Sequence, residues 1–232
     1  IYLGFHTNAF DPGSLGLYNG NNFAGAATPN QERWAEIIAS ELNTDMVAIG
    51  SPPFENEWPD RVEQGRSLTL DRSAIEFGEI RGDRINYEMD ATIIEVAAHG
   101  NVEEAEVLQD LKARRAVARA CIQAIIKYME EFDTDGGDLT MRPDTPKNFT
   151  SEFLSSQTLT LAWDEPDANE IVGDAAESYV IYRSPNGYGF ADPVYTTETS
   201  YNFQTTNDTT YFRVAARNEG GESPPTEVLA TR

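Results

Sequence analysis

The sequence predicts two domains, an α/β domain followed by a small all-β sandwich. In residues 1–135 apolar runs typical of strands alternate with stretches of helical periodicity, which favours a mostly parallel sheet covered by helices. Residues 143–232 instead carry short strand patterns separated by turns. The segment between them, 136–142, is a linker that continues a polar, glycine-bearing stretch without periodicity. A chain of 232 residues also suits two domains better than one or three.

The α/β domain begins with an apolar strand over Ile1–Phe5. Thr28–Leu42 is predicted to be a helix, because Thr28 to Gln31 has the pattern of a capping box with proline at the first helical position and apolar residues recur at helical spacing. Gly50–Asp60, rich in proline, acidic and aromatic residues, indicates a loop, and Ala74–Ile80 is a weaker strand candidate.

The second half of this domain is predicted from two strong patterns. Ala91–Val96 is a continuous β-prone run, typical of a strand buried on both faces of a sheet. Glu103–Phe132 carries one long apolar stripe and is predicted to be a second covering helix. Asp133–Asp138 then ends the periodicity; it is interpreted as a domain boundary, and it lacks the length and terminal glutamate of a calcium-binding loop.

The C-terminal residues predict five short strands. They are Thr158–Trp163, Ser178–Arg183, Thr199–Phe203, Thr210–Ala216 and Glu227–Ala230. The spacing of Trp163, Tyr179 and Tyr182, the run from Tyr211 to Asn218 and the turn from Gly220 to Pro224 resemble the fibronectin type III pattern over residues 143–232. The resemblance implies that Trp163, Phe212 and Val214 belong to the core.

Charge and cysteine content exclude several functions. The chain has 39 acidic and 17 basic residues and a formal net charge of -22, which disfavours a nucleic-acid partner. An acidic surface with little lysine fits either ordinary solubility or life in high salt.

No apolar run approaches the ~20 residues of a membrane span, and we expect a soluble chain. A single cysteine, Cys121, excludes an intrachain disulfide; on the apolar stripe of a helix it indicates core and not a nucleophile.

Two titratable residues follow predicted strands. His6 lies just past the first strand and Glu95 near the end of Ala91–Val96. Ligands gather outside the carboxyl ends of strands in open α/β sheets, so both side chains are expected to face one crevice. A neutral imidazole suits zinc and a nearby carboxylate can take a proton from metal-bound water, whereas a lone histidine after a strand is more often structural and a lone glutamate is usually solvated.

These motifs resemble the zinc-dependent N-acetylmuramoyl-L-alanine amidases. Leu3–Ala9 is similar to the family strand that ends in a zinc-binding histidine, after which an asparagine and an alanine follow. Ala91–Asn101 is similar to the family segment in which an asparagine lies six residues after a catalytic glutamate. The resemblance, which extends to the helix ending at Phe132, implies zinc as the cofactor, His6 as a metal ligand, Glu95 as the catalytic residue and peptidoglycan as the substrate. It also implies a location outside a bacterium or in its cell envelope.

The chain departs from the family at two places. Ala97 and Ala98 replace the usual glycine and large apolar residue, and His99 follows, either as a substitute ligand or as part of a loop hydrogen bond. The family's other two zinc ligands lie upstream of the strand with which this sequence begins, so we expect either a fragment of a longer protein or an unrelated piece that completes it. The rival hypothesis is a non-catalytic surface or assembly protein with a degenerate amidase-like domain.

Overall fold

The computed structural model describes residues 1–20, 27–49, 58–72, 77–133, 139–204 and 208–231. The chain divides into two compact units, Ile1–Gly137 and Asp138–Arg232. The division lies within the segment interpreted as a linker. None of the described helices is long and apolar enough to cross a membrane.

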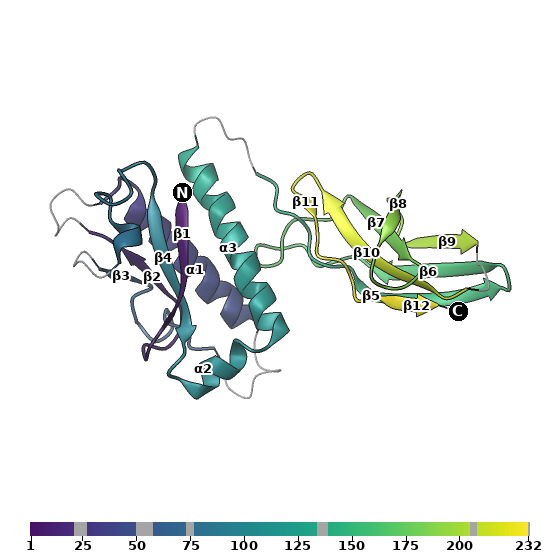
Figure 1. Cartoon of the computed structure of the whole chain (residues 1–232), viewed down its shortest axis with the longest axis horizontal. Helices are drawn as coiled ribbons and strands as arrows, with labels where there is room; N and C mark the ends of the chain where they lie inside the picture. The colour runs from purple at the N-terminus through teal and green to yellow at the C-terminus, as the bar shows by residue number, and fades with distance from the viewer. Residues whose placement is uncertain (21–26, 50–57, 73–76, 134–138, 205–207, 232) are drawn as a thin grey trace. The chain divides into compact units, whose positions relative to one another are not determined.

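The first unit is built on a four-stranded sheet in the order β1-β4-β2-β3 (Figure 1). The strands are β1 (Tyr2–Asn8), β2 (Leu15–Tyr18), β3 (Thr69–Asp71) and β4 (Ala91–Ala98). β1 runs parallel to β4 and β2 parallel to β3, but β2 runs antiparallel to β4. The sheet is therefore mixed: two of its three strand pairings are parallel, in line with the predicted mostly parallel sheet, and the pairing of β2 with β4 is antiparallel. The reason is the short connection from β1 to β2, since a parallel return needs a crossover of about a dozen residues or more.

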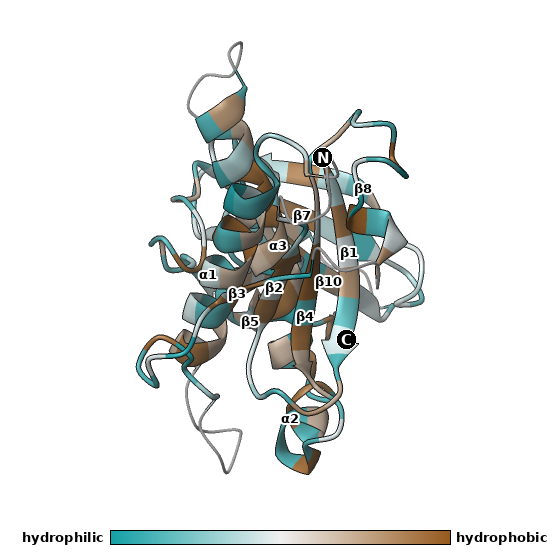
Figure 2. Cartoon of the chain, turned by 90° about the vertical axis from the view of Figure 1, so that its left-hand side faces the viewer, coloured by the Kyte–Doolittle hydropathy of each residue, from teal (hydrophilic) through white to brown (hydrophobic). Residues whose placement is uncertain are grey.

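Helices cover one face of this sheet. They are α1 (Gln31–Ile49), α2 (Val102–Val107) and α3 (Leu111–Phe132). Trp34, Ile38 and Leu42 of α1 are fully buried against β4 and α3 in one apolar core. A second core on the opposite face joins Leu15, Leu17, Ala91 and Ile93 to Ile80. All eight residues of β4 are buried, as expected of a strand covered on both faces, and its ribbon is mostly brown in Figure 2.

Several predicted boundaries of the first unit need correction. Glu103–Phe132 is two helices, because the Asp110 side chain accepts a hydrogen bond from the Lys112 amide and so caps a new helix. The predicted capping box is not formed, since Gln31 is buried and its amide donates to the carbonyls of Ile80 and Ala91. Gly78–Ile80 is a short 3-10 helix, η1, and not part of a strand. Residues 73–76 and most of the predicted Gly50–Asp60 loop lie outside the described residues.

The second unit consists of antiparallel strands in two sheets. The first sheet has the strand order β5-β6-β9. The second sheet has the order β11-β10-β7-β8, and β12 pairs with β10 in addition. Their strands are β5 (Lys147–Ser155), β6 (Thr158–Asp164), β7 (Ser178–Ser184), β8 (Ala191–Thr196), β9 (Ser200–Gln204), β10 (Thr210–Asn218), β11 (Gly221–Glu222) and β12 (Leu229–Thr231). Trp163, Phe212 and Val214 are at most 3% exposed in the core that both sheets share, which confirms their prediction as core residues.

Candidate functional site

His6 and Glu95 lie within neighbouring parallel strands, not past or at the strand ends as predicted, and they are direct register partners. β1 and β4 pair so that the Cα atom of His6 is opposite that of Glu95. Residues opposite each other in a ladder project their side chains from the same face of the sheet. The structure thus brings the two predicted residues together on the sheet face away from α1 and α3.

The Glu95 carboxyl group is buried without a full set of partners. Glu95 is 8% exposed, and its Oε2 atom has no hydrogen-bond partner among the described residues. Burial raises its pKa, and the charges of Arg72, His6 and Arg61 oppose that effect in decreasing order. A buried carboxyl group with a raised pKa and an unused oxygen can accept a proton from a bound molecule and return it.

The imidazole of His6 is held by a residue that the sequence did not predict. Its Nε2 atom lies 2.7 Å from Oε1 of Glu79 in η1, and both side chains are about one third exposed. The ring of Phe77 packs edge-on against the imidazole, with the centroids 5.8 Å apart. Each contact restricts the imidazole from a different direction, so the ring is oriented before any ligand binds.

Gly4 makes room for Glu79 beside β1. A Cβ atom at Gly4 would lie 3.0 Å from Oε1 of Glu79 and 2.9 Å from Cγ1 of Ile93. Glycine within a strand often marks a place where another group approaches closely. This glycine, two residues before His6, was therefore the one sequence signal for a side chain packed over the strand.

The described residues fit part of a zinc site. A histidine that binds zinc usually has a carboxylate beside its other ring nitrogen, and the Glu79 carboxylate lies next to Nε2, although the two form no hydrogen bond. The Nδ1 atom of His6 has no partner within the described ranges, so one ligand atom is available. A catalytic site needs three protein ligands, and the described part of the chain holds no group of three His, Cys, Asp or Glu residues that could bind a metal.

His99 takes part in a local hydrogen bond. Its Nδ1 atom lies 3.0 Å from the hydroxyl of Thr7, and its backbone N–H donates to the carbonyl of Asn8. This confirms the interpretation of His99 as a loop hydrogen-bond partner. Both contacts join the end of β1 to the residues after β4.

Asn101 and Glu104 fix the backbone around the carboxyl ends of β1 and β4. The Asn101 side chain caps α2 by accepting from the amide of Glu103. Glu104, 2% exposed and absent from the predicted site, accepts hydrogen bonds from the backbone amides of Gly13 and Ala98 and from the Asn101 side chain. A buried carboxylate with three donors anchors the loop after β1 to the end of β4.

Two other predicted features have different outcomes. Cys121 packs against the helical core, and burial raises the pKa of its thiol to about 11, which confirms that it is not an activated nucleophile. Residues 134–138, in which a calcium loop was weighed against a linker, lie outside the described residues.

Comparison with solved structures finds proteins that contain fibronectin type III domains. No family model and no curated protein matches the chain. Among solved structures, an FN3tt mutant is 24% identical over 39% of this chain and 96% of its own length, with a TM-score of 0.33. The sixth fibronectin type III domain of human fibronectin type III domain containing protein 3 is 23% identical over 38% of this chain and 83% of its own, with a TM-score of 0.34. A titin fragment is 25% identical over 38% of this chain, a match that spans 31% of that fragment, with a TM-score of 0.34.

The second unit is fibronectin type III-like by its own strand pairing. Three antiparallel strands, β5, β6 and β9, face a second sheet built on β8, β7 and β10, and the two share one core. The amidase resemblance of the first unit stays a prediction.

Proposed function

We propose that the first unit is the C-terminal part of a zinc-dependent hydrolase that cleaves the amide bond between N-acetylmuramic acid and L-alanine in peptidoglycan. The proposal combines the family resemblance with one observation, the pairing of His6 with a buried Glu95 that has an unused carboxylate oxygen. A structural glutamate in this position would ordinarily have its oxygens satisfied, because an unpaired buried acceptor costs free energy.

In this proposal each residue has a distinct task. His6 holds the metal through the nitrogen that Glu79 does not engage, and the remaining ligands come from outside the described residues. Zinc, when bound, polarises the amide carbonyl and lowers the pKa of a bound water. Glu95 removes a proton from the attacking water and delivers it to the departing amine of L-alanine. Glu79 is a positioning residue, because its carboxylate lies 2.7 Å from Nε2 and its charge favours a proton on that nitrogen.

The decisive test replaces the acid–base group while leaving the metal ligand in place. In the natural full-length protein, Glu95→Gln is expected to abolish peptidoglycan digestion while zinc content, measured by elemental analysis, is unchanged. Glu106→Gln, which alters an exposed carboxylate on α2, is the matched control and should digest at the normal rate. Wild-type digestion by Glu95→Gln would end the assignment.

One observation favours the rival function, a non-catalytic extracellular surface or assembly protein with a degenerate amidase-like domain. The Glu79 carboxylate already contacts the His6 ring, and the described residues contain no group of three His, Cys, Asp or Glu side chains that could hold a metal. A protein of this kind would bind peptidoglycan, or further copies of itself, without cleaving it. Zinc analysis combined with digestion and sedimentation with purified cell walls separates the two: binding without zinc or cleavage supports the rival.

Both functions place the protein at the exterior or in the cell envelope of a bacterium. Peptidoglycan is found there, and a fibronectin type III-like unit suits a spacer or an adhesive module. This step is an analogy at the level of the fold. Fractionation of the source cells, followed by detection of the full-length protein, tests it directly.

A further inference from the structure

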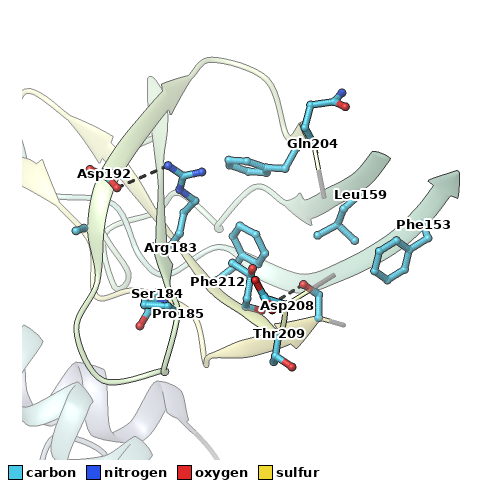
Figure 3. A pocket seen from close by; sticks show the side chains of 14 residues that line it. Phe153, Leu159, Arg183, Ser184, Pro185, Asp192, Gln204, Asp208, Thr209 and Phe212 are labelled. Atoms are coloured by element: carbon cyan, nitrogen blue, oxygen red, sulfur yellow. Dashed lines mark hydrogen bonds and ion pairs between the residues drawn. The ribbon is translucent and has the colours of Figure 1, made fainter. Parts of the chain in front are cut away.

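The second unit contains a cavity that the proposed hydrolase does not use. It has a volume of about 340 Å³ and lies at one end of the sandwich (Figure 3). Leu159, Phe203 and Phe212 contribute an apolar floor, and each is at most 8% exposed. Cavities that bind small organic molecules start at about 300 Å³ and combine such a floor with a few polar groups.

The most informative polar group in the cavity is Arg183. Side chains alternate between the faces of a strand, and Tyr179 and Ile181 of β7 both point into the core. Arg183 follows in the same alternation, at a position where an apolar residue would fill the space between the sheets. It lines the cavity instead and leaves that space open at the end of the core.

The guanidinium group of Arg183 has N–H groups that are available to a ligand. Its Nη2 atom lies 3.6 Å from Oδ2 of Asp192, which is too far for a hydrogen bond, and its Cζ atom lies 6.0 Å from the centroid of the Phe203 ring. The Arg183 side chain makes no hydrogen bond in the part of the chain that the structure describes. Figure 3 shows it beside Asp192, with aromatic rings nearby. The side chain of Asp192 is 79% exposed, so solvent screens this ion pair strongly.

We propose that this cavity binds a monocarboxylate with an apolar body. The carboxylate accepts two parallel hydrogen bonds from the Arg183 guanidinium and displaces Asp192, while the body covers Phe203 and Phe212. Two parallel hydrogen bonds between a guanidinium group and a carboxylate are charge-assisted, and they are stronger than hydrogen bonds between neutral groups. Asp192 and Asp208 also line the cavity, and because their repulsion grows with the charge of the ligand, a monocarboxylate is favoured over a dicarboxylate.

The test compares two acids with their uncharged amides on the full chain. Phenylacetate and N-acetylphenylalanine are titrated against the protein in parallel with phenylacetamide and N-acetylphenylalanine amide, and binding is followed by NMR chemical shifts. The buffer contains about 0.15 M salt, at which the net charge of the protein is screened beyond about 8 Å. A preference for phenylacetate indicates free small acids as ligands, and a preference for N-acetylphenylalanine indicates the C-terminus of a peptide.

Three variants assign the binding to the cavity. Arg183→Gln is expected to weaken either acid about tenfold and to leave amide binding unchanged, because only charge-assisted pairing is lost. Ala191→Phe adds a ring at the exposed rim and is expected to weaken both acids and amides. Arg217→Gln is the matched control: that arginine is also half-exposed, lies over the Tyr195 ring and has a long ion pair, but it does not line the cavity.

The outcomes separate cleanly. Shifts at cavity residues, acid preferred over amide, and loss in Arg183→Gln but not in Arg217→Gln support the proposal. Equal binding of acid and amide, an unchanged Arg183→Gln variant, or no saturable binding up to tens of millimolar overturns it. Folding of each variant is checked by the dispersion of its NMR spectrum, and since Ala191→Phe leaves the arginine intact, the two cavity variants test the site independently.

Discussion

Removing the charge of Asp45 should stabilise the first unit at alkaline pH. Asp45 lies on α1 with no exposed surface, and its Oδ2 atom is 3.5 Å from Nε of Arg119 on α3. Its Oδ1 atom has no hydrogen-bond partner among the described residues. Burial raises the pKa of this carboxyl group from 3.8 to about 7, and Glu41 adds to the effect while Arg119 and Lys127 oppose it.

The sign of the effect follows from the direction of the pKa shift. Because the folded-state pKa of Asp45 is above its unfolded value, the folded unit binds the proton more tightly, and stability falls as pH rises toward the folded pKa. A rise of about three pKa units corresponds to roughly 4 kcal/mol of destabilisation above pH 7. Between pH 5.5 and pH 8 the contribution of Asp45 should change by about 2 kcal/mol, since more than half of the interval lies below the folded pKa.

Urea unfolding followed by circular dichroism at 222 nm measures this effect. All described helices belong to the first unit, so the helical signal reports its unfolding separately from that of the second unit. The stability gained by Asp45→Asn over wild type should grow by about 2 kcal/mol from pH 5.5 to pH 8. Glu36→Gln, which changes an exposed carboxylate on the same helix, serves as the control. An Asp45→Asn advantage that stays constant or shrinks with rising pH would refute the reasoning.

Three further substitutions test the packing around the site and the second core. Glu104→Ala should cost about 3 kcal/mol, because it leaves buried donors unpaired, and urea unfolding at 222 nm checks it; a loss below about 0.5 kcal/mol contradicts the anchoring role. Gly4→Ala should cost about 2 kcal/mol by the same assay, since the new Cβ atom meets Ile93 and Glu79, and neutral behaviour would mean that β1 has free space above it. Trp163→Ala should cost about 3 to 5 kcal/mol in the second unit while the helical transition stays in place; a shift of that transition would show that the units do not unfold independently.

The second unit was largely predictable because its core strands alternate. Thr158–Asp164 buries every second residue, and the predicted strand Thr158–Trp163 differs from it by one residue. β5 was missed because most of its residues are exposed, so no alternation marks it. β8 was missed for a related reason: Ala191–Thr196 has no buried residue, and Pro193 lies within it. Hydrophobic patterning thus finds strands that bury one face and overlooks those at the edges.

In the first unit, tertiary contacts override some local sequence patterns. Gln31 has the right spacing for a capping box, but its amide is used to join the ends of η1 and β4. β2 was missed because it is four residues long and contains Gly16, where a Cβ atom would lie 2.4 Å from the Ala35 carbonyl. Because Gly16 has no side chain, α1 can approach the sheet closely, and local strand propensity does not predict such a contact.

The same contrast explains what could be predicted of the site. The sequence places His6 and Glu95 in apolar runs typical of strands, but their proximity depends on the direct parallel pairing of β1 with β4, which the chain order does not predict. Glu79 lies in a three-residue helix distant in sequence from both strands, and its contact with His6 depends on how residues 77–85 cover the sheet. The sheet therefore decides which two groups meet, whereas the covering segment decides which nitrogen of the imidazole stays available. A carboxylate at Glu79 leaves Nδ1 as the atom for a ligand, so the chemistry open to this histidine is set by a residue that no strand pattern could reveal.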